Sequence, residues 1–126
     1  MFKRIDHVEI IPRDMDKTID FYTKVLGFNM KSRRKNESGP MKEIVYLTLG
    51  DTMLELLTVG DPRESTPDTR RIGYRMMAIE VDDMDKAFEY LKTRGISPSA
   101  GPVTLGVSKR AEILDPDGNS VELRQW

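Results

Sequence analysis

The sequence contains no cysteine, which excludes disulfide bonds, thiolate nucleophiles and cysteine-ligated metal sites. It has a single tryptophan, Trp126, and few other aromatic residues, so it offers little stacking surface for a planar ligand. No apolar run approaches the ~20 residues that a membrane-spanning helix needs. Residues 1–6 carry charges instead of the apolar stretch of a secretory signal. We therefore expect a soluble, cytoplasmic protein.

An excess of charge of one sign is also missing. Twenty Lys and Arg residues against 21 Asp and Glu residues leave a formal net charge of −1. Such a balance gives no reason to expect nucleic acid or an anionic membrane as the partner. The 126 residues, 38% hydrophobic and 33% charged, suffice for one globular domain with a real core.

What the sequence does contain is an internal repeat. The segment Asp-Met-Asp-Lys at 14–17 recurs at 83–86, a shift of 69 residues, and Leu-Glu-Leu at 54–56 matches Val-Glu-Leu at 121–123, a shift of 67. Between them, Gly27 matches Gly95 at a shift of 68. Short deletions in loops produce such a falling offset. The repeat predicts a single domain, residues 1–126, made of two modules at about 1–59 and 74–126 with a linker at 60–73.

Each module is predicted to form a βαβββ unit. In the first module, strands are expected at residues 5–11, 28–35, 43–49 and 52–58, with a helix at 15–26. In the second, strands are expected at residues 75–81, 98–105, 108–114 and 120–125, with a short helix from Met84 to about Leu91. Turns are predicted at Gly50-Asp51 and at 115–119. The fold class is therefore α+β, with two pseudo-symmetric modules forming a curled, partly closed mixed sheet.

The first helix has both of its ends marked in the sequence. Asp14 is a suitable N-cap, and Gly27 suits the left-handed position that closes a helix. Between them, one helical face carries apolar side chains at the expected spacing: Met15, Ile19, Tyr22, Val25 and Leu26.

The repeat also pairs the residues that could carry chemistry. His7, the only histidine, is the counterpart of Met76, and Glu55 is the counterpart of Glu122. An imidazole with carboxylates is a ligand set for Zn²⁺, Ni²⁺, Fe²⁺, Mn²⁺ or Co²⁺. A lone histidine is more often an ordinary surface or core residue. Met76 has a weak, neutral thioether and is expected to line the pocket.

The two glutamates differ in what their strands predict. Glu55 lies on a strand that is apolar on both faces, so its carboxylate would cost several kcal/mol to bury without a cationic partner or a metal. Glu122 lies on a strand with ordinary polar alternation, which a half-solvated position also explains. Its match to Glu55 is what makes it a candidate ligand.

The sequence resembles the vicinal-oxygen-chelate superfamily, which includes glyoxalase I, bleomycin-resistance proteins and dioxygenases. The resembling segments occur in order along nearly the whole chain: Ile5-Asp6-His7-Val8, Phe21-Tyr22, Leu26-Gly27-Phe28, Leu54-Glu55-Leu56, Glu80-Val81-Asp82-Asp83, Asp115-Pro116-Asp117-Gly118-Asn119 and Val121-Glu122-Leu123.

The resemblance implies a metal-dependent lyase or isomerase of the glyoxalase I type. His7, Glu55 and Glu122 would be metal ligands, and Glu122, or else Glu55, would be the catalytic base. It implies a divalent metal cofactor, a small vicinal-oxygen substrate (a hydroxycarbonyl or thioester) and a homodimer, with or without exchange of halves between subunits.

Three departures from the family pattern keep other functions open. Met76 stands where glyoxalase I and epimerase relatives carry His or Gln, which also argues against a dioxygenase iron triad. Ile11 replaces an Arg that glutathione-binding relatives carry, and Thr58-Val59-Gly60 lacks their Asn, so glutathione is not expected. The alternatives are a metal-free binding or resistance protein of the bleomycin-resistance type and an epimerase acting on a coenzyme A thioester.

Overall fold

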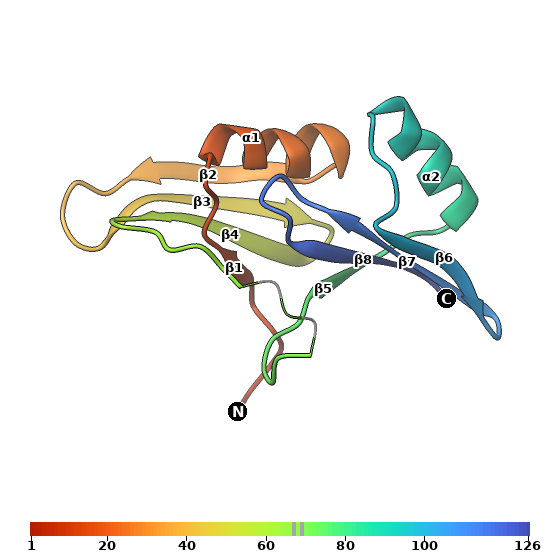
Figure 1. Cartoon of the computed structure of the whole chain (residues 1–126). Helices are drawn as coiled ribbons and strands as arrows, with labels where there is room; N and C mark the ends of the chain where they lie inside the picture. The colour runs from red at the N-terminus through yellow and green to blue at the C-terminus, as the bar shows by residue number, and fades with distance from the viewer. Residues whose placement is uncertain (67, 69) are drawn as a thin grey trace. The chain divides into compact units, whose positions relative to one another are not determined.

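The computed structural model describes residues 1–66, 68 and 70–126. The chain divides into two compact units, Met1–Ser65 and Thr66–Trp126 (Figure 1). The single-domain organisation, with modules at 1–59 and 74–126, stays a prediction. Residues 67 and 69 of the predicted 60–73 linker lie outside the described residues.

The first unit contains one four-stranded mixed sheet with the strand order β1-β4-β3-β2. β1 pairs parallel with β4, and the other neighbours are antiparallel. Its elements are β1 (Val8–Ile10), α1 (Met15–Asp20), η1 (Phe21–Val25), β2 (Asn29–Lys35), β3 (Met41–Leu49) and β4 (Thr52–Val59).

The second unit repeats this topology in the order β5-β8-β7-β6, again with one parallel pair, β5 with β8. Its elements are β5 (Met77–Glu80), α2 (Met84–Thr93), β6 (Ala100–Leu105), β7 (Ser108–Leu114) and β8 (Ser120–Gln125). The predicted α+β class and the two βαβββ units are thereby confirmed. The closure of the two sheets into a partly closed barrel stays a prediction.

The strand registers make Glu55 and Glu122 equivalent positions. Glu55 lies beside Glu9 of β1, and Glu122 lies beside Ala78 of β5. On the antiparallel side, Glu55 lies beside Tyr46, and Glu122 lies beside Glu112. The predicted correspondence of the two glutamates is therefore correct.

In the first unit, Glu55 lies on the opposite face of the sheet from the most deeply buried residues of its central strands. Val45 and Leu47 on β3 and Leu54 and Leu56 on β4 are fully or almost fully buried. They alternate with Tyr46 and Glu55, which must point to the opposite face because successive strand residues do so. Figure 1 shows α1 over one face of this sheet. The register of the central strands thus places Glu55 on the other face, beside Tyr46 and among buried residues such as Leu57.

The predicted helix at 15–26 changes type partway along. The Asp14 side chain accepts a hydrogen bond from the Lys17 backbone N–H at 3.1 Å, as expected of an N-cap. From Phe21 to Val25 the chain is a π-helix, whose wider turn shifts the buried face. Phe21, outside the predicted face, is buried, whereas Val25 and Leu26 are only partly buried.

The first strand of each unit is shorter than predicted. β1 covers Val8–Ile10 instead of 5–11, and β5 covers Met77–Glu80 instead of 75–81. The reason in the first unit is that β1 has a single partner strand and pairs with it only at Leu54 to Leu56. Ile5 and Ile11 accordingly lie 86% and 51% exposed. No helix among the described residues is long and apolar enough to cross a membrane.

Candidate metal centre

His7 and Glu9 are brought beside Glu55 by the parallel pairing of β1 with β4. His7 immediately precedes β1, and Glu9 is its middle residue, two positions further along. In an extended chain, residues two apart point to the same face. Glu9 is the register partner of Glu55, so three potential metal ligands gather at this strand pair.

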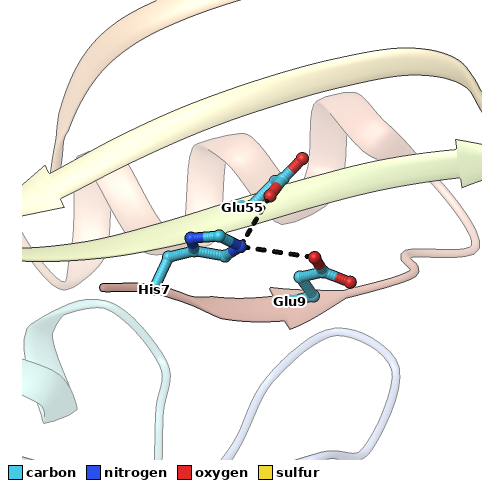
Figure 2. Close-up of side chains that lie close together, drawn as sticks. All are labelled: His7, Glu9 and Glu55. Carbon is cyan, nitrogen blue, oxygen red and sulfur yellow. Dashed lines mark hydrogen bonds and ion pairs between the residues drawn. The ribbon is translucent and has the colours of Figure 1, made fainter. Parts of the chain in front are cut away.

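The His7 imidazole lies between carboxylates on both of its nitrogen atoms, and Figure 2 shows the two at Nε2. Its Nε2 lies 3.0 Å from Glu55 Oε2 and 3.3 Å from Glu9 Oε1. Its Nδ1 lies 2.9 Å from Asp6 Oδ2. These hydrogen bonds, first to Asp6 and then to Glu9, raise the pKa of His7 above its ordinary value. In the protonated form, both ring nitrogens donate to carboxylates.

Glu55 is the least solvated member of this cluster, with only 6% of its surface exposed. The hydroxyl of Tyr46, its neighbour on β3, donates a hydrogen bond to Glu55. Burial raises the pKa of Tyr46, and this hydrogen bond raises it further. The Tyr46 and His7 rings also meet edge to face, with centroids 6.2 Å apart. Tyr46 therefore fixes Glu55 and limits the motion of His7.

The cluster suits a divalent cation by its donor chemistry. One imidazole nitrogen and two carboxylate oxygens, from His7, Glu9 and Glu55, lie within 4.8 Å of one another. Asp6 occupies Nδ1 and so orients Nε2 toward the carboxylates, as partners of ligating histidines do. A borderline cation such as Zn²⁺, Ni²⁺ or Mn²⁺ accepts these donors.

Glu122 has cationic partners of another kind, in the second unit. Arg124 donates to one of its oxygens through Nε at 2.8 Å, and Arg110 donates to the other through Nη2 at 3.0 Å. Burial alone would raise the pKa of Glu122, but the two arginines outweigh it and lower the pKa. Arg110 also donates to Glu112 at 2.7 Å. Glu122 is therefore an ionised carboxylate held by guanidinium groups.

The structure shows a contact between two of the predicted site residues and leaves the other two untested. His7 and Glu55 are in contact. Glu122 belongs to the other unit, so its convergence with them stays a prediction. Met76, half-buried just before β5, lies 3.9 Å through its sulfur from Arg75 Nη1, and its predicted role as pocket lining also stays a prediction.

Sequence reasoning missed Glu9 and Arg110. Glu9 could have been found, because it lies two residues after His7 in a predicted strand and must share its face. Arg110 is the register partner of Arg124, so it approaches Glu122 diagonally across the strand pair. No spacing within the sequence indicates that contact before the register is known.

Comparison with known proteins places this arrangement in a family. A family model for the Glyoxalase/Bleomycin resistance protein/Dioxygenase superfamily matches residues 4–123. A protein of Vibrio cholerae named "Probable lactoylglutathione lyase" is 33% identical over 132 residues, which cover 97% of this chain and 90% of that protein. The chain belongs to the glyoxalase/bleomycin resistance/dioxygenase superfamily, as the sequence resemblance predicted.

Solved structures share the fold over the same length. The trypanothione-dependent glyoxalase I of Leishmania major superposes with a TM-score of 0.79 at 25% identity, covering 98% of this chain and 87% of that one. An antibiotic-binding protein from Streptomyces, TnmS3, superposes with a TM-score of 0.76 at 22% identity, covering 98% and 96%. The second similarity shows the fold alone.

Proposed function

We propose that the protein is a metal-dependent lyase or isomerase of the glyoxalase I type, acting on a small hydroxycarbonyl or thioester substrate. The observation that carries the proposal is the contact of His7 Nε2 with Glu55 Oε2 at 3.0 Å, because Glu55 is buried and its cationic partner is a histidine. The similarity to proteins named lactoylglutathione lyase supports the same class of reaction.

The proposed ligands are His7, Glu55 and Glu122, with Met76 lining the pocket. When bound, a divalent ion of Ni, Zn, Mn, Fe or Co would act as a Lewis acid toward a substrate carbonyl. Asp6 holds the orientation of His7, and Tyr46 holds that of Glu55. The protein itself therefore supplies a pair of donors, each with a hydrogen-bonding partner of its own, on one face of the first sheet.

Glu122 is the proposed general base, and Glu55 is the alternative. A base must be ionised before it can remove the proton beside a carbonyl. Arg110 and Arg124 lower the pKa of Glu122, so it meets this condition. The same two guanidinium groups weaken its basicity, which favours Glu55 as the alternative base.

Ile11 argues against a substrate that carries glutathione, although the proposal does not depend on this point. Ile11 is 51% exposed and has no group that could pair with a substrate carboxylate. A homodimer and a cytoplasmic location are further proposals that rest on the family and on composition.

Replacement of Met76 by His tests the proposed function at the position where metal-binding relatives carry a ligand and this chain does not. The change adds an imidazole, so the affinity for Ni²⁺ or Zn²⁺ should rise by about tenfold or more, which corresponds to about 1.4 kcal/mol. Calorimetric titration of chelator-treated wild type and Met76→His measures this. If neither protein binds a divalent ion, the metal-dependent function is wrong.

The pH dependence of metal affinity follows from the environment of His7. The pKa of His7 lies above its ordinary value of 6.5, so the proton that a metal must displace is already bound at higher pH than in a free histidine. Affinity should therefore be highest at alkaline pH and fall as the pH drops through this raised pKa. Titrations at a series of pH values check this, and an affinity independent of pH would contradict ligation by His7.

A metal-free small-molecule binding protein is the second candidate. Met76 favours it, because a thioether completes a carboxylate-rich site poorly. This candidate predicts that the purified protein, prepared without chelator, contains no stoichiometric divalent metal. An epimerase acting on a coenzyme A thioester is a third, which Met76 disfavours.

A further inference from the structure

We propose that Glu9 is a metal ligand, so that His7, Glu9 and Glu55 form a three-residue cation site within the first unit. This inference rests on the proposed metal-dependent function and adds a residue to its site. Glu9 Oε1 lies 3.3 Å from His7 Nε2, the same nitrogen that Glu55 approaches to 3.0 Å (Figure 2). All three donors lie on the same face of the β1–β4 pair.

The buried and partly buried glutamates of the two sheets differ in the residue type of their salt-bridge partners. Glu43 pairs with Arg33, and both Glu112 and Glu122 pair with Arg110. Arginine stays charged at any physiological pH, so these pairs are permanent. Within the part of the chain that the structure describes, the salt-bridge partner of Glu55 is a histidine, which can lose its charge and ligate a metal.

Glu9 lies beside Glu55, a second carboxylate. Like charges side by side on adjacent strands destabilise a sheet. Glu9 and Glu55 are register partners on one face, and Asp6 adds a third carboxylate on the other side of the His7 ring. A single imidazolium cannot balance three carboxylates. Asp6 accepts the hydrogen bond of His7 Nδ1 at 2.9 Å, so Glu9 and Glu55 share the single proton on Nε2. A divalent ion in place of the shared proton would neutralise both.

The two units differ at the positions of His7 and Glu9. The counterpart of His7 is Met76, and the counterpart of Glu9 beside Glu122 is Ala78. The positions of the second unit that correspond to His7 and Glu9 therefore offer no imidazole or carboxylate, and arginines already hold Glu122. The first unit offers three ligands. Glu9 thus supplies the donor that the position of Met76 lacks.

Charge-neutral replacement of Glu9 tests the inference in the full-length, chelator-treated protein. Glu9→Gln keeps the size of the side chain and removes its charge. We expect the dissociation constants for Zn²⁺, Ni²⁺ and Mn²⁺, measured by calorimetry, to rise at least about tenfold. Loss of a residue that only orients a ligand costs about 10-fold to 100-fold, so loss of a ligand itself should cost no less. Glu80→Gln, an exposed glutamate on β5, is the matched control and should bind as wild type does.

Thermal unfolding without metal separates ligation from a structural role. If Glu9 repels Glu55 in the metal-free protein, Glu9→Gln should melt at the same temperature as wild type or higher. A lower melting temperature with unchanged metal affinity would make Glu9 a structural partner of His7 and overturn the inference.

The two proposals can also fail separately. If wild type binds metal and Glu122→Gln weakens binding while Glu9→Gln does not, the inference about Glu9 is wrong and the proposed function stands. If wild type binds none of the three ions, both are wrong.

Discussion

Glu55→Gln should reduce the affinity for a divalent cation by at least about 100-fold. Loss of a residue that only orients a ligand costs up to about 100-fold, and Glu55 is proposed to be a ligand itself. The amide keeps the shape of the side chain and its hydrogen bond with Tyr46 but removes the charge beside His7 Nε2, 3.0 Å away. With 6% of its surface exposed, Glu55 lies where water screens little, so its charge contributes more than that of an exposed carboxylate. Calorimetric titration with Ni²⁺, Zn²⁺ and Mn²⁺ measures the loss.

Glu43→Gln is the matched control for this experiment. Glu43 is also a glutamate on a strand of the first unit, with 8% of its surface exposed, but its cationic partner is Arg33, at 2.9 Å from Arg33 Nε to Glu43 Oε2. Its replacement should destabilise the protein and leave metal affinity unchanged. Equal losses of affinity in both variants would mean that folding of the unit, and not ligation by Glu55, governs binding.

The sequence was sufficient to predict the fold class because two independent patterns agreed. The repeat predicted two equivalent units, and the strand periodicity predicted the order of elements within each. β7 and β8 were predicted to the residue, at 108–114 and 120–125. The turn between them is fixed locally, because Asp115 Oδ1 accepts hydrogen bonds from the backbone N–H groups of Asp117 and Asn119.

The errors occurred where the outcome depends on contacts outside the segment. The shortening of β1 follows from its single pairing with β4, which periodicity cannot reveal. The π-helix from Phe21 to Val25 has the same cause, because the apolar residues there also fit an α-helical face. Propensity and periodicity describe one element at a time. They therefore cannot predict which of two apolar faces of a helix will pack against the sheet.

The sequence predicts the contact partner of Glu55 but not the partners of Glu122. Glu55 was recognised because an ionisable group on a strand that is apolar on both faces needs a cationic partner, and the structure places His7 there. The arginine partners of Glu122 depend on the β7–β8 register. Register is a property of the folded sheet, so the sequence does not predict the salt bridges of Glu122, whose role as a metal ligand stays a prediction.

The largest effect on stability is expected for Tyr22→Ala. Tyr22 is fully buried, and its ring packs edge to face on Phe21 at 5.1 Å and on Phe28 at 5.6 Å between centroids. Removal of a large buried aromatic side chain loses its transfer free energy and leaves a cavity, at a cost of about 3–5 kcal/mol in the free energy of unfolding. The loss of edge-to-face contacts adds to this cost. Urea unfolding followed by circular dichroism measures it.

Tyr90→Ala provides the same chemical change in the second unit, at the helix position that the repeat aligns with Phe21. Tyr90 is 42% exposed and contacts the Arg94 guanidinium at 5.4 Å from its ring centroid. An exposed cation–π contact contributes about 0.5–1 kcal/mol, so the free energy of unfolding should fall by no more than about 1 kcal/mol. The aligned residues are Tyr90-Leu91 and Phe21-Tyr22, and in the second unit Leu91, 2% exposed, is the one that packs into the core. Comparable destabilisation by Tyr22→Ala and Tyr90→Ala would contradict this prediction, because the loss would then not depend on burial of the ring.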